Sequence, residues 1–299
     1  MTSSVPSAAI DLGKTRCRLL LTDGDERIRI DGDGAPGLAS SQGVDAAVAA
    51  IDALLRHVDA TLAHLGVGAA GAWVAPEEAG KLAHRLAART GTSVVVASDV
   101  VTAHLGALGG EAGTLLIAGT GAAALGVDAG GARLVDGWGP DLGDFGSGSW
   151  LGREMLRAVV RADVGLGPET ALTRVVTERV GAASVILSWI ARDEPLARRL
   201  ATLAPSVLDA AESGDVVALG IADEAVRLLT ASAAAASSSV AVAVHGGLTD
   251  HPWFRAKLGA SLMSAGRTVV PAAGDALDGA LLLSRRTDLP HERFAHRAE

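Results

Sequence analysis

Two short turns in this chain carry the residue types that bind phosphate groups. The first runs from Asp11 to Thr15 and the second from Gly119 to Gly121, each between two apolar runs. Backbone N–H groups in such turns, helped by a threonine hydroxyl, can hold phosphate oxygens. Asp11 would hold Mg²⁺ through water, because Mg²⁺ keeps several waters and takes few carboxylates. The alternative for the first segment is an ordinary Asp-x-Gly turn without a ligand.

Gly13, Lys14 and Thr15 also match the end of a Walker phosphate loop, but their context excludes that motif. A Walker loop has a glycine five positions before its last glycine and continues into a helix. Position 8 is alanine here, and the residues from Cys17 onward have the pattern of a strand. We therefore interpret the segment as one half of a paired hairpin clamp, with Gly119–Gly121 as the other half.

Asp99 is the candidate catalytic base. It follows the buried-strand pattern Val94–Val96 and precedes a predicted helix, so it lies at the carboxyl edge of a sheet, where ligands of open α/β sheets bind. A carboxylate there can accept the proton of a hydroxyl that attacks a γ-phosphate. The alternative is a helix N-cap, a role that Ser98 or Asp99 would also fill.

The segment from Asp136 to Arg153 is the most distinctive part of the sequence. Five glycines between positions 137 and 148 alternate with Asp141, Asp144 and Trp138. This pattern predicts a shaped loop that leads into a helix, whose N-terminus near residues 147–149 can face an anion or a polar ligand.

Gly246 and Gly247 form a third glycine site, directly after an apolar strand that ends at Val244. Without side chains at these positions, the adenosine of a nucleotide could lie against the backbone. A purely structural role is the alternative for each glycine pair.

The elements expected to position these residues occur in an order that repeats. Three strands (8–10, 17–21 and 28–33) are followed by alternating helices and strands up to residue 104, the pattern of a ribonuclease-H-like unit. A second set begins with a strand at 114–118, the turn Gly119–Gly121 and a strand at 122–127. We therefore predict an α/β protein with an actin-like ATPase fold. Its two ribonuclease-H-like lobes, 1–110 and 111–299, would have a nucleotide cleft between them.

Composition limits the remaining possibilities. The chain has 299 residues, of which 49% are hydrophobic, and a formal net charge of −8, which disfavours a nucleic-acid surface. The single cysteine, Cys17, excludes an intrachain disulfide and a cysteine metal cage. No apolar run is long enough to span a bilayer, and the first residues lack the pattern of a secretion signal. We expect a cytoplasmic homodimer that binds neither membrane nor nucleic acid.

The histidines at 57, 64, 84, 104, 245 and 251 show no metal-ligand spacing, and we expect them on helix surfaces or in loops.

Together, these motifs resemble the BadF/BadG/BcrA/BcrD ATPase family, which includes N-acetylglucosamine kinases. The resemblance covers nearly the whole chain in the expected order, and the glycine-rich run from 136 to 153 is its most specific part. It implies ATP and Mg²⁺ as cofactors and a small sugar as substrate. The residues it implies are Asp11 for the metal; Gly13, Lys14, Thr15, Gly119, Thr120 and Gly121 for phosphate; Gly246 and Gly247 for adenosine; Asp99 as the base; and Asp99, Thr120, Gly137 and Asp144 for the sugar.

The function expected from the resemblance is ATP-dependent phosphorylation of a sugar hydroxyl, on N-acetylglucosamine, glucosamine or a related hexose. Two departures put the identity of the sugar in doubt. The loop Gly34–Gly37 lacks an asparagine that sugar kinases of the family often carry, and Ala122 and Ala123 replace a polar pair. The alternatives are an ATPase or a nucleotide- or sugar-sensing pseudokinase. An iron–sulfur activator role would need more cysteines than this chain supplies.

Overall fold

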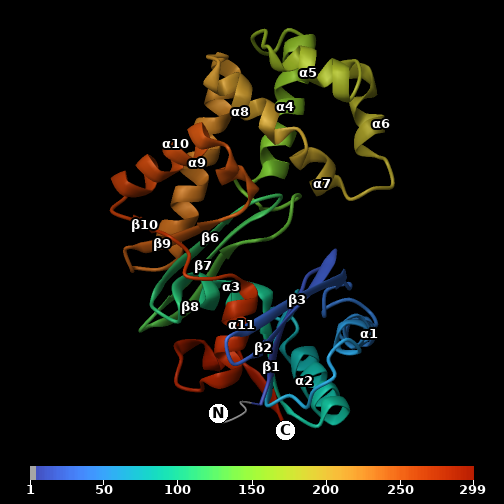
Figure 1. Ribbon diagram of the computed structural model, residues 1–299. Coiled ribbons are helices and arrows are strands. Elements are labelled where there is room, and N and C mark those ends of the chain that lie inside the picture. Colours follow the sequence, from blue (N-terminus) through green and yellow to red (C-terminus); the bar gives the residue numbers. More distant parts are fainter. Residues whose placement is uncertain (1–4) are drawn as a thin grey trace. The chain divides into compact units, whose positions relative to one another are not determined.

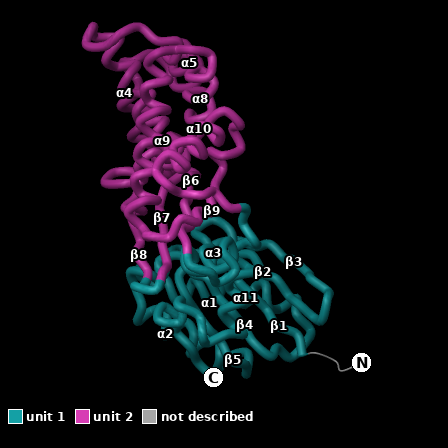
Figure 2. The backbone as a smooth tube through the Cα atoms, turned by 90° about the vertical axis from the view of Figure 1, so that its left-hand side faces the viewer, with its two compact units in different colours: residues 1–112, 129–131, 271–299 teal, residues 113–128, 132–270 magenta. Residues whose placement is uncertain are grey.

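A computed structural model describes residues 5–299 of the chain (Figure 1). The chain divides into two compact units, shown in different colours in Figure 2. Unit 1 contains residues 5–112, 129–131 and 271–299, and unit 2 contains residues 113–128 and 132–270. The C-terminal part, residues 271–299, was expected in the second lobe and instead belongs to unit 1, because its last strand pairs with a strand of the first sheet.

Unit 1 is built on a six-stranded sheet with the order β11-β5-β4-β1-β2-β3. The strands are β1 (Ser7–Leu12), β2 (Arg16–Asp23), β3 (Glu26–Asp33), β4 (His64–Ala69), β5 (Ser93–Ser98) and β11 (His296–Ala298). The first three strands form an antiparallel meander, whereas β4 and β5 run parallel to β1. The ends of these parallel strands align, with Leu12 opposite Ala69 and Ala69 opposite Ser98. Asp11 and Asp99 therefore lie at one edge of the sheet.

Helices cover both faces of this sheet. Its helices are α1 (Gly43–Leu55), α2 (Pro76–Thr90), α3 (Asp99–Leu108) and α11 (Ala276–Arg285), with a short 3₁₀ helix at Pro290–Phe294. Ile10 of β1 packs into the core formed with α1 and α2, while its neighbour Ala9 packs with Leu277 and Ala280 of α11. Alternate residues of a strand point to opposite faces, so a continuous apolar run is what a strand buried on both sides requires.

Glycines allow α3 to lie unusually close to its neighbours. A Cβ on Gly68 of β4 would overlap the side chain of Thr102 in α3. A Cβ on Gly106 or Gly279 would overlap the backbone of the facing helix. Close packing on two sides fixes the position of α3, whose first residue is Asp99.

Unit 2 repeats the strand arrangement in a five-stranded sheet with the order β10-β9-β6-β7-β8. Its strands are β6 (Gly113–Ala118), β7 (Ala122–Asp128), β8 (Gly131–Asp136), β9 (Ala241–His245) and β10 (Thr268–Val270). β6 and β7 form a hairpin and β9 runs parallel to β6, as β4 runs parallel to β1. The predicted repeat and the α/β class are confirmed.

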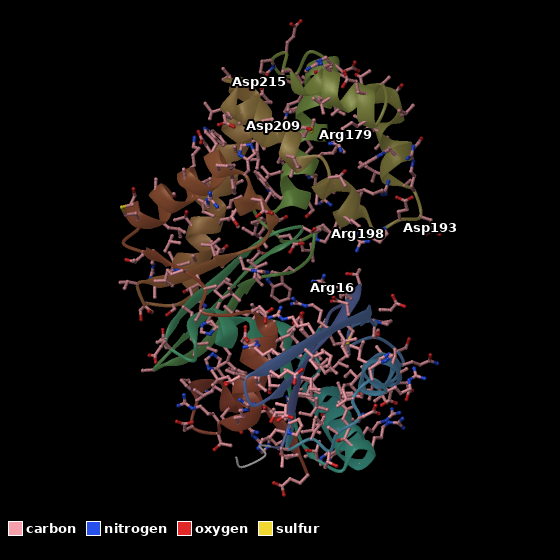
Figure 3. The ribbon with its side chains drawn as sticks, in the orientation of Figure 1. Arg16, Arg179, Asp193, Arg198, Asp209 and Asp215 are labelled. Atoms are coloured by element: carbon pink, nitrogen blue, oxygen red, sulfur yellow. The ribbon has the colours of Figure 1, made fainter. Side chains whose placement is uncertain are left out.

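A helical region separates β8 from β9 in the sequence. It contains α4 (Gly148–Asp163), α5 (Leu172–Arg179), α6 (Ile186–Ile190), α7 (Leu196–Ala201), α8 (Ala204–Glu212) and α9 (Val216–Ala236), with a 3₁₀ turn at Ala183–Val185; α10 (Pro252–Ser264) follows β9 and a 3₁₀ turn at Gly247–Asp250. Asp215, labelled in Figure 3, caps α9 by accepting the N–H of Ala218 and also accepts the N–H of Ala171. Within residues 5–299, no helix combines the length and apolar character needed to cross a membrane.

The expectation for His104 was wrong. This side chain is fully buried in α3, and its Nδ1 lies 2.9 Å from Nε2 of His291, which is also fully buried. Burial lowers the pKa of His291 to about 3, and the nearby His104 adds to the effect. His291 is therefore uncharged at neutral pH, and the pair is a buried contact that joins α3 to the C-terminal segment.

Candidate active site

Asp11 lies at the carboxyl end of β1, where Arg18 holds one of its oxygens. The two residues are directly opposite each other in the β1–β2 hairpin. Arg18 donates hydrogen bonds from Nε at 3.0 Å and from Nη2 at 2.5 Å, both to Oδ2 of Asp11. Its Nη1 also lies 3.7 Å from Oδ2 of Asp275, at the start of α11. Within the described residues, the other Asp11 oxygen, Oδ1, has no hydrogen-bond partner and can accept one from water.

The first turn is closed by its backbone and supported from one side. The N–H of Gly13 donates to the carbonyl of Arg16 at 2.9 Å, and the carbonyl of Gly13 accepts from Ala35 at 3.2 Å. Gly34 packs so closely on the turn that a Cβ there would meet Thr15 N at 2.6 Å. Lys14 and Thr15 are exposed at the tip, so their polar groups can reach a ligand.

Asp99 starts α3 at the same sheet edge. Its Oδ1 accepts hydrogen bonds from Ser98 Oγ at 3.0 Å and from Val100 N at 2.9 Å. Burial raises the pKa of Asp99, and the charge of Asp11 raises it further, while the two hydrogen bonds and Lys14 act in the opposite direction. Within the described residues, no hydrogen bond engages Oδ2 of Asp99. This partly buried carboxylate, whose pKa is raised, therefore has one oxygen that can accept a proton.

The second turn, Gly119–Gly121, joins β6 to β7 and is tied to the start of α4. The N–H of Gly119 donates to the carbonyl of Gly121 at 3.0 Å. Gly148 N donates to the carbonyl of Gly119 at 2.8 Å, and Ser149 N donates to the carbonyl of Thr120 at 3.0 Å. The Thr120 side chain is exposed. The turn and the N-terminus of α4 therefore form one rigid piece of backbone.

Asp144 lies directly beneath the second turn. It is 8% exposed, and its Oδ1 accepts the N–H of Ala122 at 3.3 Å. A Cβ on Gly121 would stand only 2.9–3.1 Å from the Asp144 carboxylate. A side chain at position 121 would therefore press on this carboxylate and displace it.

Asp136 organises the loop that carries Asp144. Its carboxylate accepts the N–H groups of Asp144 at 2.8 Å and of Phe145 at 2.7 Å. Asp136 and Asp144 have φ values of 64° and 56°, and Gly137 has a φ of 81°. Positive φ is rare for residues other than glycine, so the loop is held in a demanding conformation by these bonds.

Gly137 and the adenosine glycines lie against the second turn and its strands. A Cβ on Gly137 would stand 3.3 Å from the Cβ of Ala123, one of the two residues that replace a polar pair. Gly246 has a φ of 121°, and a Cβ there would lie 2.8 Å from Gly119 N. Gly247 follows and is exposed. Close contact with the second turn explains the need for glycine at position 246.

The structure thus gathers the predicted residues into two groups. Unit 1 carries Asp11, Gly13, Lys14, Thr15 and Asp99, and unit 2 carries Gly119, Thr120, Gly121, Gly137, Asp144, Gly246 and Gly247. Sequence reasoning missed Arg18 and the role of Asp136. The hairpin register would have placed Arg18 opposite Asp11, whereas no local pattern predicts the bonds that Asp136 makes eight and nine residues away.

Comparison with known proteins decides the family. The model of the BadF/BadG/BcrA/BcrD ATPase family matches residues 9–270, which include every candidate site residue. The chain belongs to this ATPase family. Family membership and the repeated sheets together establish the actin-like fold with two ribonuclease-H-like lobes.

Individual relatives agree with this assignment. The chain is 34% identical over 122 residues to an N-acetyl-D-glucosamine kinase of Dictyostelium discoideum, covering 40% of this chain and 38% of that protein. It is 30% identical over 128 residues to the glucosamine kinase GspK of Vibrio cholerae, covering 42% and 43%. The match thus spans about two fifths of each curated relative. A crystal structure of a candidate N-acetylglucosamine kinase from Chromobacterium violaceum superposes with a TM-score of 0.75, at 27% identity over 93% of this chain and 98% of that one.

The donor groups of unit 1 fit a Mg²⁺ ion that arrives with phosphates. Among residues 5–299, no three His, Cys, Asp or Glu side chains gather as a metal cage. Mg²⁺ is usually bound by one or two carboxylates, several waters and the phosphates of a substrate. Asp11, with Oδ1 open at the sheet edge, suits this mode.

Proposed function

We propose that this member of the family transfers the γ-phosphate of ATP to a hydroxyl of a sugar, namely N-acetylglucosamine, glucosamine or a related hexose. The observation that carries the proposal is that Asp11 and Asp99 lie at one edge of the unit 1 sheet. Lys14 is near enough for its positive charge to lower the pKa of Asp99. A metal-side carboxylate, a base and a cation beside a phosphate-binding turn are the parts that phosphoryl transfer needs.

Asp99 would act as the general base. Its Oδ1 is held by Ser98 and Val100, so the open Oδ2 accepts the proton of the sugar hydroxyl while the hydroxyl oxygen attacks the γ-phosphorus and ADP leaves. Burial raises the pKa of Asp99, which strengthens it as a base. Mg²⁺, when bound near Asp11, would neutralise charge on the phosphates.

The glycine turns would hold the donor. Backbone N–H groups at Gly13–Thr15 and Gly119–Gly121 would bind the phosphates, and the Lys14 ammonium and the Thr120 hydroxyl are exposed for the same purpose. Adenosine would lie over Gly246 and Gly247.

The sugar would contact the loop that follows β8. Asp144 lies beneath the second turn with a carboxylate that can accept sugar hydroxyls, and Gly137 and Thr120 lie close to it in the unit 2 fold. The names of the two curated relatives support an amino sugar. Ala122 and Ala123 offer no side-chain hydrogen bond, so discrimination among sugars would rest on the remaining polar groups.

A coupled assay of ADP release tests this function. The full chain is supplied with ATP and Mg²⁺ and with N-acetylglucosamine, glucosamine, N-acetylmannosamine, glucose or no sugar. We expect one or two of the sugars to increase ADP release well above the sugar-free rate. ADP release that is the same with and without every sugar would identify an ATPase, and nucleotide binding without any release would identify a sensing pseudokinase.

Cys17 disfavours an iron–sulfur role. It is buried in β2, and burial raises the pKa of its thiol to about 12, with a contribution from Asp11. A cluster ligand must be a thiolate, which this environment opposes. The homodimer and the cytoplasmic location stay predictions, and light scattering of the purified chain would test the first.

A further inference from the structure

A cavity of ≈ 630 Å³ lies in unit 2 between α4, α6 and α7. That volume is within the range of small-molecule sites, roughly 300–1,000 Å³. The residues that line it include none of the proposed ATP or sugar contacts. Most of the lining is apolar and comes from Leu156, Val160, Ile186, Leu187, Ile190, Leu196 and Leu200.

A row of arginines forms the cationic side of this cavity. Arg153, Arg157 and Arg161 are four residues apart on α4, which places them on one helix face, where like charges repel. Arg153 lies 3.3 Å from Asp141 and Arg157 lies 2.6 Å from Glu154. No hydrogen bond or ion pair within residues 5–299 engages the Arg161 side chain. The cavity therefore has an excess of positive charge, in a chain whose net charge is −8.

Apolar side chains at the cavity edge are open to water. Leu187 is 78% exposed and Val160 is 39% exposed, and both line the cavity. A concave apolar surface with exposed large side chains is typical of a binding site. A neutral apolar ligand would leave the Arg161 guanidinium without a protein partner, and the excess positive charge of the lining would repel a cation. The combination fits a ligand with an apolar body and a negative head.

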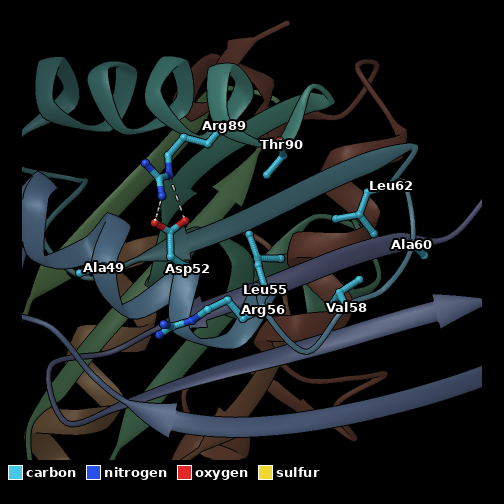
Figure 4. A pocket seen from close by; sticks show the side chains of 9 residues that line it. All are labelled: Ala49, Asp52, Leu55, Arg56, Val58, Ala60, Leu62, Arg89 and Thr90. Carbon is cyan, nitrogen blue, oxygen red and sulfur yellow. Dashed lines mark hydrogen bonds and ion pairs between the residues drawn. The ribbon is translucent and has the colours of Figure 1, made fainter.

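A second cavity, of ≈ 790 Å³ in unit 1, has a smaller excess of positive charge, because Arg56 and Arg89 share its lining with Asp52 (Figure 4). There Arg89 donates from Nε to Asp52 at 3.1 Å, so these two charges satisfy each other. The carboxyl ends of α1 and α2, at Leu55 and Thr90, also line it, and the partial negative charge of helix ends disfavours an anion.

We propose that the cavity beside α4 binds an amphiphilic organic anion, with an acyl chain against α6 and α7 and a carboxylate or phosphate head on Arg157 and Arg161. Guanidinium groups bind either head through charge-assisted hydrogen bonds, which are stronger than neutral ones. The binding is independent of catalysis, so it can be measured whether or not the chain transfers phosphate.

Titration calorimetry of the full chain with decanoate tests the proposal. Decyl phosphate distinguishes a phosphate head from a carboxylate, decyltrimethylammonium reverses the charge, and acetate removes the chain. We expect decanoate or decyl phosphate to bind saturably at one site per chain. The ammonium and acetate probes should bind at least about tenfold more weakly, because each lacks one half of the recognition.

Variants assign the binding to this cavity. Arg157→Gln combined with Arg161→Gln, and separately Leu187→Ser, should each weaken decanoate binding by about tenfold. All three side chains are exposed, so the variants should fold. Val216→Ser is the matched control, because Val216 is 81% exposed and lies outside the cavity lining.

Three results would overturn the proposal. Decanoate affinity could be unchanged in the cavity variants, or lost equally in Val216→Ser. The ammonium probe could bind as tightly as decanoate. Light scattering could show that Leu187→Ser separates a dimer into monomers while decanoate affinity is unchanged, which would make this face an interface between two copies.

Discussion

The two phosphate turns are built in different ways. In unit 2, the turn Gly119–Gly121 is fixed by backbone hydrogen bonds to α4 and by close packing of Gly246. In unit 1, the turn is bordered by ionised side chains, with Arg18 shared between Asp11 and Asp275. Backbone bonds fix the shape of the second turn, and the Asp144 carboxylate packs beneath it. We therefore expect substitutions beside the first turn to change chemistry and substitutions in the second to change packing.

The largest effect is expected for Asp99→Asn. The amide keeps the size of the side chain and can still accept the hydrogen bonds from Ser98 and Val100, but it cannot accept the sugar proton. Turnover should fall by about 10²–10⁴-fold, the usual contribution of a general base. Steady-state kinetics with the sugar that gives the fastest ADP release measures this change.

Nucleotide affinity is the control for Asp99→Asn. The phosphate turns are untouched, so the Kd for ATP, measured by calorimetry, should stay close to the wild-type value. Retained turnover would remove Asp99 from the role of base. Loss of ATP binding would instead show that Asp99 supports the structure of the site.

Gly121→Ala tests the packing of the second turn. The new Cβ would stand 2.9–3.1 Å from the buried Asp144 carboxylate, so this carboxylate, the turn or the loop must move. Overpacking of this kind costs about 1–3 kcal/mol of unfolding free energy. Denaturant melts measure the loss, and Gly119→Ala is the matched control, because its Cβ would meet nothing closer than 3.8 Å. Equal stability of the two variants would contradict the packing argument.

Arg18→Gln tests the charged side of the comparison. Burial is the main cause that raises the pKa of Asp99, and the negative charge of Asp11 raises it further. Without the Arg18 guanidinium, its positive charge no longer offsets that of Asp11, so the pKa of Asp99 should rise again. Because the base works when deprotonated, a higher pKa moves the acidic limb of the pH–rate profile to higher pH. We also expect turnover to fall by about tenfold through loss of a charged hydrogen bond.

Arg16→Gln is the control for Arg18→Gln. Arg16, labelled in Figure 3, lies 3.9 Å from Asp31, and their side chains are 61% and 68% exposed. Such a surface pair contributes little, so turnover should change by less than about twofold and the acidic limb should stay in place. An unmoved limb in Arg18→Gln as well would show that Arg18 does not set the charge around the base.

These predictions depend on features that the sequence reveals to different degrees. The turns at Gly13 and Gly119 were predictable, because glycine and threonine between apolar runs specify a hairpin locally. The Arg18–Asp11 pair follows from the register of that hairpin once its length is known. The bonds of Asp136 to the loop, and the return of residues 271–299 to unit 1, depend on contacts between distant parts of the chain. No local propensity encodes such contacts, and the buried pair His104–His291 escaped notice for the same reason.

The smallest expected effect concerns how α3, which carries Asp99, is held in place. An unfolded histidine takes up a proton as the pH falls below about 6.5, whereas the pKa of buried His291 is lowered to about 3. Folding stability should therefore decrease as the pH falls from about 6.5 towards 3, by up to about 1.4 kcal/mol per pH unit for this group. His291→Gln retains an N–H donor for His104 but does not titrate, so denaturant melts between pH 7.5 and 4.5 should show a shallower decrease than in the wild type. His84→Gln, at an exposed position on α2, should leave the slope unchanged. Equal slopes in the wild type and His291→Gln would mean that burial does not keep His291 from taking up a proton in the folded state.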